Sequence, residues 1–302
     1  MDSIERDVEQ TLLYYDLWQY PLSAEELFAF LPHNSITLDQ FSQRLRELDP
    51  GGNVLEHEGF FFMKGRTGRI VSERKAREQY ARTMWRAARA AMHIIKRFPF
   101  VRGVFVSGDL SKNVSTRSSD VDFFIITSPN RLWITRVLLT MFKRTVLLNR
   151  KKFFCINTFA TTDRLLLDEQ NIYLASEIAH LKPLYNGRLF REYLRVNDWI
   201  WKFFPNFDPD LLPRPAPSER QSIVQKFLER ALGVLPCDRI DTFLLGLMQH
   251  VWARRYPQFD DEGRRRHFRS TKHESRAYPN NYQDVVLGRY EEKLRAANIP
   301  HG

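Results

Sequence analysis

The chain has only two cysteines, Cys155 and Cys237, among its 302 residues. They form neither a CxxC motif nor a zinc-type His/Cys cluster, which argues against a disulfide framework and favours a reducing compartment. No apolar run approaches the roughly 20 residues that a membrane-spanning helix needs. The start MDSIERDVEQ is charged and lacks the apolar core of a secretory signal. We therefore expect a cytoplasmic protein with no membrane partner.

Several well-known fingerprints are also missing. The sequence contains no Gly-rich Rossmann motif, no Walker loop and no Ser/His/Asp order. Acidic residues are outnumbered, because 46 Lys and Arg face 36 Asp and Glu, giving a net charge of +10 and a pI near 9.7. This excess permits an anionic partner, such as a nucleoside triphosphate, a nucleic acid or an acidic protein.

The excess positive charge gathers in three clusters. One such cluster alone is more typical of a solvated face than of a binding surface, but three together favour at least one functional patch for a nucleic acid or protein partner. The clusters are Lys64, Arg66, Arg69, Arg74, Lys75 and Arg77; then Lys143, Arg144, Arg150, Lys151 and Lys152; then Arg264, Arg265, Arg266, Arg269, Lys272 and Arg276.

The most informative stretch is 104–126, VFVSGDLSKNVSTRSSDVDFFII. It predicts a short apolar strand, a tight turn, a polar loop and a second apolar strand. Side chains alternate along a strand, so Asp120 and Asp122 are expected on the same side. Two neighbouring carboxylates repel each other, and a hard divalent cation with oxygen ligands neutralises such a pair. The pair therefore predicts a metal site.

The turn before the loop has the composition of a phosphate cradle. Gly108 lets the backbone approach a phosphate chain closely, while Ser107, Ser111 and Lys112 offer hydroxyls and a positive charge. A phosphate cradle followed by a carboxylate pair is what nucleotidyl or phosphoryl transfer needs. The plainer alternative is a strand that ends in two solvated aspartates after an ordinary loop.

Residues 101–159 resemble the nucleotidyltransferase superfamily that includes DNA polymerase beta. The resemblance rests on the strand, the turn glycine Gly108 and the Asp120-Val121-Asp122 triplet flanked by apolar residues. It implies a small mixed β-sheet core and Mg²⁺ or Mn²⁺ held by Asp120 and Asp122. It also implies an NTP whose phosphates are positioned by Ser107, Gly108, Ser111 and Lys112. The implied reaction moves a nucleoside monophosphate to an acceptor, which is a small molecule, an RNA or a protein, and releases pyrophosphate.

Two residues depart from the family pattern. Asp109 follows the turn glycine where the family carries Ser or Gly, and an acid beside a triphosphate is unfavourable unless it faces away or meets a metal. The family also has a third carboxylate on a later strand, but the expected strand 153–159, FFCINTF, offers Asn157. An amide oxygen can ligate Mg²⁺ but cannot accept a proton. Asn157 is therefore either a catalytic-site residue or a sheet-edge residue, and Asp163 and Asp168 are weaker candidates for the missing acid.

Residues 1–65 predict a separate module of three helices and a hairpin. Apolar spacing marks helices over 4–18, 23–31 and 38–48, and Ser23 with Glu26 reads as a capping box. Two short strands follow, with Glu58-Gly59 as their turn. The module resembles a winged helix-turn-helix, which often binds nucleic acid. The third helix is nearly neutral, so a packing or protein-contact role is the favoured interpretation.

The rest of the chain is assigned by periodicity and breakers. We expect a long basic connecting helix within 66–100, the nucleotidyltransferase core over 101–165, and a helical region over 166–302. In the core, 131–141 predicts a helix and 146–148 and 153–159 predict strands. In the helical region, 172–180, 189–201, 219–233, 239–256 and 282–297 predict helices. We expect 203–217 to be an extended wrap and 258–281 to be irregular.

A few polar residues of the C-terminal half are possible site residues. Three of them could line a nucleotide or acceptor pocket: Tyr173, Glu177 and Asn197. The alternative for each is a place on an ordinary helix surface. His250, His267 and His273 are more typical of surface loops than of catalysis.

These patterns together predict an α+β fold, with a small mixed-sheet nucleotidyltransferase core, an N-terminal winged-helix-like domain and a helical C-terminal region. The predicted function is metal-dependent nucleotidyl transfer. One alternative is a catalytically degenerate nucleotide sensor or scaffold. The other is a nucleic-acid-binding regulator that works through the winged helix and the basic clusters.

Overall fold

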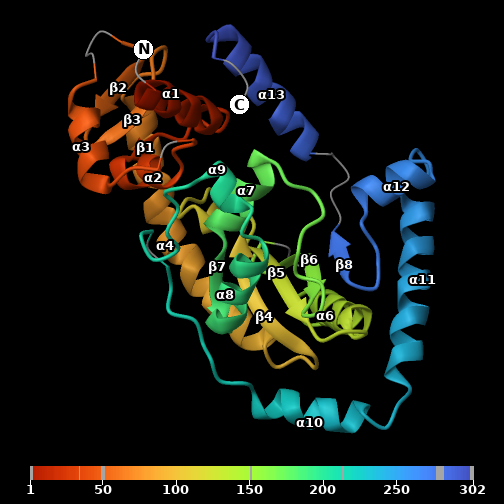
Figure 1. Cartoon of the computed structure of the whole chain (residues 1–302). Helices are drawn as coiled ribbons and strands as arrows, with labels where there is room; N and C mark the ends of the chain where they lie inside the picture. The colour runs from red at the N-terminus through yellow and green to blue at the C-terminus, as the bar shows by residue number, and fades with distance from the viewer. Residues whose placement is uncertain are drawn as a thin grey trace.

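The computed structural model describes residues 3–33, 35–48, 52–149, 152–212, 214–276 and 282–299. Within these ranges the chain is a mixed α/β protein with two sheets, of strand order β1-β3-β2 and β7-β4-β5-β6-β8 (Figure 1). The strands are β1 (Leu22–Ser23), β2 (Val54–His57), β3 (Phe60–Met63), β4 (Val101–Ser107), β5 (Asp122–Thr127), β6 (Cys155–Thr161), β7 (Lys182–Tyr185) and β8 (Glu274–Arg276). The helices are α1 (Ser3–Asp16), α2 (Ala24–Ala29), α3 (Leu38–Arg46), α4 (Arg69–Ile95), α5 (Gly108–Ser111), α6 (Leu132–Thr145), α7 (Ile172–His180), α8 (Gly187–Val196), α9 (Ile200–Phe203), α10 (Ile223–Leu232), α11 (Cys237–Arg255), α12 (Asp261–His267) and α13 (Tyr282–Ala296).

The N-terminal module, α1 to β3, contains the three helices and the hairpin that the sequence predicts. The predicted capping box begins α2, where the Ser23 side chain accepts a hydrogen bond from the Glu26 N–H and the Glu26 carboxylate accepts one from the Ser23 N–H. At the hairpin turn, Glu58 and Gly59 both have positive φ, 51° and 78°. Two central residues with positive φ match the twist of adjacent strands, so this turn fixes the pairing of β2 with β3.

The sequence analysis missed one strand of this module. Leu22 and Ser23 pair antiparallel with Phe61 and Phe60, so β1 closes a three-stranded sheet with β3 at its centre. A strand of two residues after a proline carries too little periodicity to be predicted from sequence.

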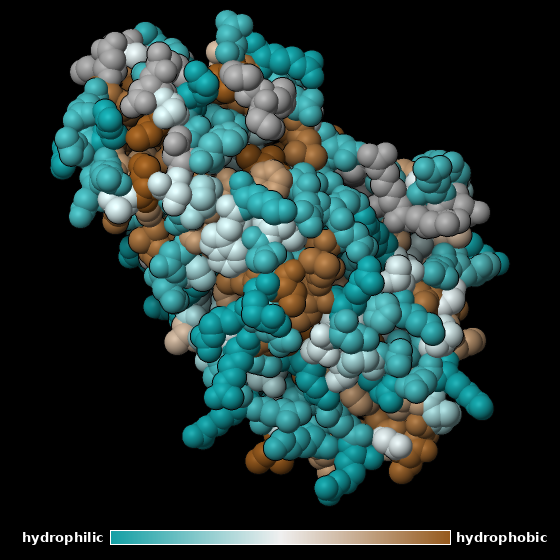
Figure 2. Space-filling view, viewed as in Figure 1, coloured by the Kyte–Doolittle hydropathy of each residue, from teal (hydrophilic) through white to brown (hydrophobic). Residues whose placement is uncertain are grey.

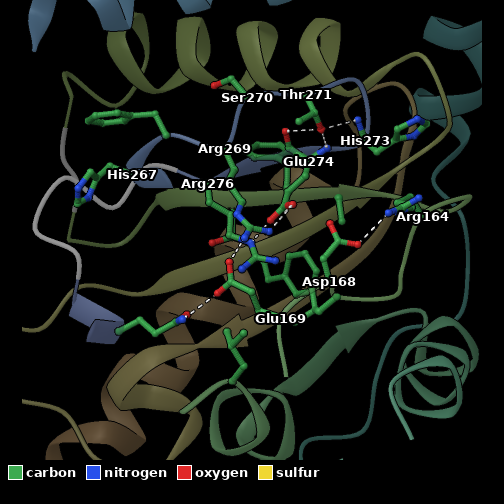
Figure 3. Close-up of a pocket in the computed structure, with 18 of the residues that line it drawn as sticks. Arg164, Asp168, Glu169, His267, Arg269, Ser270, Thr271, His273, Glu274 and Arg276 are labelled. Carbon is green, nitrogen blue, oxygen red and sulfur yellow. Dashed lines mark hydrogen bonds and ion pairs between the residues drawn. The ribbon is translucent and has the colours of Figure 1, made fainter. Parts of the chain in front are cut away.

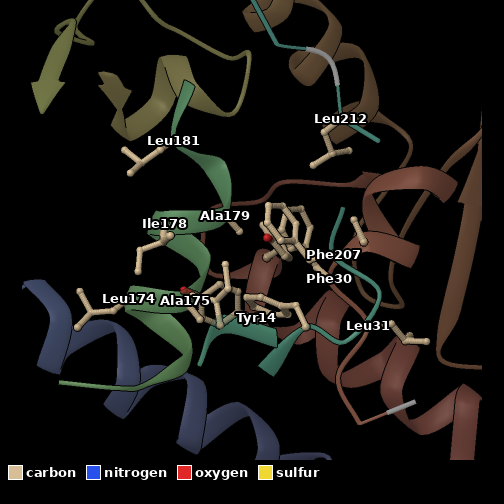
Figure 4. Close-up of a cluster of buried hydrophobic side chains, with 14 of the residues drawn as sticks. Tyr14, Phe30, Leu31, Leu174, Ala175, Ile178, Ala179, Leu181, Phe207 and Leu212 are labelled. Atoms are coloured by element: carbon tan, nitrogen blue, oxygen red, sulfur yellow. The ribbon is translucent and has the colours of Figure 1, made fainter. Parts of the chain in front are cut away.

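The N-terminal module shares its hydrophobic core with the C-terminal part of the chain (Figure 4). The Phe30 ring of the module stacks on His180 at the end of α7, with 4.5 Å between ring centroids. Phe204 meets the same ring edge-on, and Ile178 and Phe207 belong to the same buried cluster. The module therefore lies directly over α7 rather than forming a core of its own.

The long helix predicted between the module and the core is α4, and its basic face is largely neutralised. Arg74 is buried and lies 2.6 Å from a Glu26 carboxylate oxygen and 2.8 Å from one of Glu78. Other cations of the first basic cluster also pair with carboxylates: Arg66 with Asp16, Arg69 with Glu73 and Lys75 with Glu58. This cluster therefore offers less free charge to a nucleic acid than the sequence suggests.

The larger sheet is mixed, as predicted. β4 and β5 run antiparallel with Ser107 opposite Asp122, and β5 runs parallel to β6 with Asp122 opposite Cys155. The parallel pair is joined through α6, which covers one face of the sheet (Figure 1). The antiparallel pairing brings the turn after β4 next to the first residue of β5.

Two predictions about strands are wrong. Residues 146–148 continue from α6, since the Val146 N–H donates to the Phe142 carbonyl, and they form no strand. The region 166–302 is not purely helical, because it supplies both edges of the larger sheet: β7 pairs with β4 and β8 pairs with β6. β7 contains Pro183 and β8 has three polar residues, so neither has a strand-like sequence pattern. The predicted boundary at residue 165 therefore divides this sheet.

The remaining C-terminal helices wrap around the sheet. The predicted helix over 189–201 is two helices, α8 and α9, and the predicted irregular stretch contains α12 and β8, with residues 277–281 outside the described part. Asp241 fixes α11 on α6, because its carboxylate accepts hydrogen bonds from the backbone N–H groups of Trp133 and Ile134. α13 packs against α1 and α7.

The face seen in Figure 2 is mostly hydrophilic, with hydrophobic areas near its centre and at the lower end, where α10 lies. Ile223 and Phe227 of α10 are 85% and 71% exposed. The predicted extended wrap before this helix is held in place by buried Phe204, Phe207 and Leu212. Among the described helices, none is long and apolar enough to cross a membrane.

Candidate functional site

The end of β4 and the start of β5 form the floor of the candidate site. Gly108 follows β4 with φ of +66°, in the left-handed region that favours glycine. A Cβ atom at this position would lie 2.7 Å from Asp122 Oδ2. The turn thus needs glycine for its backbone angle and also for the close approach of the Asp122 carboxylate.

The carboxylates beside this turn carry uncompensated negative charge. The pKa of Asp122 is raised to about 6, mainly by burial and in addition by the charges of Asp120, Asp109 and Glu177, while a hydrogen bond with Cys155 opposes the rise. Within the described ranges, no lysine, arginine or histidine forms an ion pair with Asp120 or Asp122. An added cation would relieve this repulsion.

Asp109 and Ser111 both follow the Gly108 turn, but one side chain is exposed and the other is buried. Asp109 is exposed, and its Oδ2 accepts a hydrogen bond of 2.8 Å from the Ser119 hydroxyl. Ser111 is buried and donates to the Gly108 carbonyl at 2.7 Å. The Ser111 hydroxyl therefore stabilises the turn, and this placement does not support its predicted contact with a phosphate.

Lys112 reaches the site from the end of α5. Its Nζ lies 2.9 Å from Glu177 Oε1 of α7, and both side chains are partly buried. The Tyr20 hydroxyl of the N-terminal module donates to the Lys112 carbonyl at 2.9 Å. Lys112 is thus held from two distant parts of the chain and faces the carboxylates.

Asn157 of β6 lies at the predicted place beside the acidic pair. Its amide Nδ2 donates to the Cys155 sulfur at 2.9 Å. Burial, followed by the charge of Asp122, raises the pKa of the Cys155 thiol to about 12, so this thiol stays protonated. Asn157 brings an amide rather than a proton acceptor to the site.

Several of these residues line a pocket of about 210 Å³, which we call the acidic pocket, whereas Asp120, Ser111 and Cys155 are not among its lining residues. It lies where the N-terminal module, α4, the turn after β4, β6, α7 and α13 meet. Its lining includes Tyr15, Trp18, Tyr20, Arg77, Ser107, Gly108, Asp109, Lys112, Val114, Asp122, Phe123, Asn157, Thr158, Tyr173, Glu177 and Tyr282.

Sequence reasoning missed some of these residues and found others. Arg77 was grouped with a basic cluster, but it lines the acidic pocket, and its Nε is buried without a hydrogen-bond partner in the described part of the chain. Tyr173 and Glu177 line the pocket, as one of the two interpretations held. Asn197 does not, because its side chain bonds the backbone of Leu165 and Leu167. Only the fold could bring Arg77 and Glu177 to the same place.

A second, larger pocket of about 1390 Å³ adjoins the first, and we call it the paired pocket (Figure 3). Its charged side chains neutralise each other. Arg164 lies 2.8 Å from Asp168, Arg276 pairs with Glu274, and Arg269 pairs with Glu169 and, at 3.8 Å, with Glu274. The residues that line both pockets are Ser107, Thr158, Tyr173, Glu177 and Tyr282.

The weaker sequence candidates lie in or beside the paired pocket. His250, His267 and His273 line it, and the His273 Nδ1 is 3.5 Å from Asp163. Asp168 lines it as well, in its pair with Arg164. Neither Asp163 nor Asp168 lines the acidic pocket, so neither replaces Asn157 as a third acid there.

The donor set suits Mg²⁺ or Mn²⁺ only in part. Asp120 and Asp122 are hard oxygen ligands, and their repulsion favours a cation between them. In the described ranges no group of three or more His, Cys, Asp or Glu residues is arranged to hold a metal ion. Because Mg²⁺ is often bound by one or two carboxylates together with substrate phosphates, the residues present fit a metal that arrives with a nucleotide.

Comparisons with protein-family models, with curated proteins and with solved structures gave no match for this chain.

Proposed function

We propose that this protein is a metal-dependent nucleotidyltransferase. The observation that carries the proposal is the approach of Asp122 to the Gly108 turn, which is so close that a Cβ atom on residue 108 would lie 2.7 Å from Asp122 Oδ2. A backbone turn free of side-chain bulk, placed beside two uncompensated carboxylates, suits a phosphate chain with its cation.

Each residue of the acidic pocket would have a definite task. The Gly108 backbone and the Ser107 hydroxyl would hold the phosphate chain, and Lys112 and Arg77 would balance its charge. Asp120 and Asp122 would hold Mg²⁺ or Mn²⁺, which when bound supplies positive charge to the phosphates and to the departing pyrophosphate. The acceptor hydroxyl would then attack the α-phosphorus in line with the leaving group.

The N-terminal module is proposed to be a winged helix. Its chain order α1-β1-α2-α3-β2-β3 and its sheet order β1-β3-β2 support this assignment. The pairing of Arg66, Arg69 and Lys75 with carboxylates weakens the case for nucleic-acid binding. The contribution of Tyr20 to the acidic pocket instead favours a role in building the site.

The test is pyrophosphate release from each of the four ribonucleoside triphosphates with Mg²⁺ or Mn²⁺. Cell extract supplies a pool of acceptors. We expect release by the wild type and its loss in the Asp120→Ala/Asp122→Ala variant, while Glu73→Gln, which removes a carboxylate from an exposed ion pair that lines neither pocket, keeps it. Equal release by the wild type and the double variant would refute the proposal.

A degenerate nucleotide sensor is the second candidate, and Asn157 favours it because no strand carboxylate accompanies the acidic pair. Nucleotide binding measured by calorimetry, without release from any triphosphate, would support the sensor over the transferase.

A further inference from the structure

The proposed transfer needs a group that accepts the proton of the acceptor hydroxyl, and the acidic pocket restricts the choice. Asp122 approaches the Gly108 turn, and Asp120 lies two residues before it, ahead of the start of β5, so the proposed function assigns both carboxylates to the cation. Asn157 has an amide, which accepts no proton. Cys155 is buried, and its pKa is raised to about 12.

Glu177 occupies the position that a proton acceptor requires. It lines the acidic pocket, where the phosphates would lie, and it also lines the larger paired pocket, from which an acceptor would enter. Among the residues that the structure describes as lining both pockets, Glu177 alone has a carboxylate. Asp122 lines the acidic pocket as well, so the two side chains border the same space.

In the structure Glu177 is held in an ion pair, because its Oε1 lies 2.9 Å from the Lys112 Nζ. This contact engages one carboxylate oxygen of Glu177 with the ammonium. The same ammonium is the cation placed to meet a phosphate chain. Lys112 therefore has two anionic partners to choose between, Glu177 and the nucleotide.

We infer that Glu177 is the proton acceptor of the transfer, and that it becomes available when the nucleotide phosphates draw Lys112 away from it. The inference rests on the proposed function. In the transfer step Glu177 takes the proton of the acceptor hydroxyl as the acceptor oxygen forms a bond to the α-phosphorus. The bond from the α-phosphorus to the bridging oxygen breaks, and pyrophosphate leaves with that electron pair.

The assignment also bears on the acceptor. Arg164, Arg269 and Arg276, three of the arginines that line the paired pocket, are already matched by carboxylates. The lining also contains Arg264, together with the further carboxylates of Glu262 and Asp284. A polyanionic acceptor would find little unbalanced positive charge there. The acceptor class that fits is a polar molecule or a protein segment with a free hydroxyl and little net negative charge.

The experiment measures two quantities on Glu177→Gln: the binding of magnesium tripolyphosphate by calorimetry, and pyrophosphate release. Tripolyphosphate is the probe because it contains the three phosphates of a nucleotide without the sugar or the nucleobase. Loss of the competing carboxylate should tighten tripolyphosphate binding about 3- to 10-fold, since Lys112 is freed and a nearby negative charge is removed. Release should fall about 100-fold or more, since the proton acceptor is lost.

Two variants serve as controls. Lys112→Met should weaken tripolyphosphate binding and lower release together. Glu73→Gln removes an equal charge from an exposed ion pair with Arg69 on α4, neither residue of which lines either pocket, and should leave both quantities within about 2-fold of wild type.

The opposite signs expected for Glu177→Gln separate this role from a purely structural one. Weaker tripolyphosphate binding together with lower release would show that Glu177 merely holds Lys112 in place, and would overturn the inference. Unchanged pyrophosphate release by Glu177→Gln would also overturn the inference, because another group would then accept the proton of the acceptor hydroxyl. If the wild type releases no pyrophosphate, the proposed function fails and the proton-transfer role fails with it. Tighter tripolyphosphate binding by Glu177→Gln would then support the competition for Lys112 alone.

Discussion

The acidic pocket and the paired pocket use carboxylates in opposite ways. In the paired pocket, Glu169, Glu274 and Asp168 each lie against an arginine. In the acidic pocket, the described residues provide no cationic partner for Asp120 or Asp122, and the pKa of Asp122 rises to about 6. Paired charges stabilise a fold or destabilise it little, whereas unpaired buried charges destabilise it. Buried charges without a partner are therefore typical of a binding or catalytic site. The two adjoining pockets thus separate a structural set of charges from a candidate functional set.

The largest expected effect comes from Gly108→Ala. The added Cβ would meet Asp122 Oδ2 at 2.7 Å and would also strain a backbone with φ of +66°. Displacement of the carboxylate or of the turn should lower pyrophosphate release by about 100-fold or more. The matched control is Gly59→Ala, which has φ of +78° but nothing within 4 Å of the added atom. Comparable losses in both variants would mean that backbone strain, and not the close approach to Asp122, is responsible.

Asp122→Asn should stabilise the protein in the absence of metal. The pKa of Asp122 is raised from 3.8 to about 6, so between these values the folded state binds more protons than the unfolded state. Stability therefore falls as pH rises through this window and stays lower above it. Removing the charge should raise the free energy of unfolding by about 1 to 3 kcal/mol near pH 7.5, and change it little below about pH 4. Denaturant unfolding of the wild type and Asp122→Asn, with EDTA present, measures the free energy of unfolding at the two pH values. An equal increase at both pH values would rule out the titration of Asp122 as its cause.

Glu274→Gln makes the same charge change in the paired pocket and should have the opposite sign. The substitution leaves Arg276 and Arg269 with one carboxylate fewer, and all three side chains are partly buried. The free energy of unfolding should fall by about 1 to 2 kcal/mol under the same conditions. Stabilisation by Glu274→Gln would contradict the distinction between the two pockets.

The smallest expected effect is that of the cation alone. Because the described residues include no group of three or more His, Cys, Asp or Glu arranged to hold a metal ion, Mg²⁺ or Mn²⁺ without nucleotide should bind weakly. At about ten times its dissociation constant the ion should stabilise the wild type by about 1.4 kcal/mol. Thermal unfolding with and without the ion tests this, and the gain should vanish in Asp122→Asn and persist in Glu274→Gln. A gain retained in Asp122→Asn would place the cation elsewhere.

The core of the candidate site could be predicted because its residues are close in the sequence. The strand, the turn glycine and the two aspartates lie within 104–126, although β5 begins only at Asp122, so the shared face predicted for Asp120 and Asp122 stays a prediction. The capping box at Ser23 and the Glu58-Gly59 turn were predictable for the same reason, since neighbouring backbone groups determine them.

Contacts between distant segments could not be predicted in this way. β7 and β8 have weak strand patterns and exist because β4 and β6 offer them backbone hydrogen bonds. Ser111 looked like a phosphate ligand, yet burial directs its hydroxyl to the Gly108 carbonyl. Arg77 and Glu177, 100 positions apart, are brought to one pocket by the packing of α4 and α7 around the sheet.

The sequence by itself determined the turn, the acidic pair and most of the helices, because each depends on residues within a few positions of one another. The tertiary structure alone decided which charges are neutralised, since Lys112 pairs with Glu177 across 65 positions while Asp122 meets no cation in the described chain. Electrostatic compensation depends on distance in space and on burial, and neither can be read from spacing along the chain.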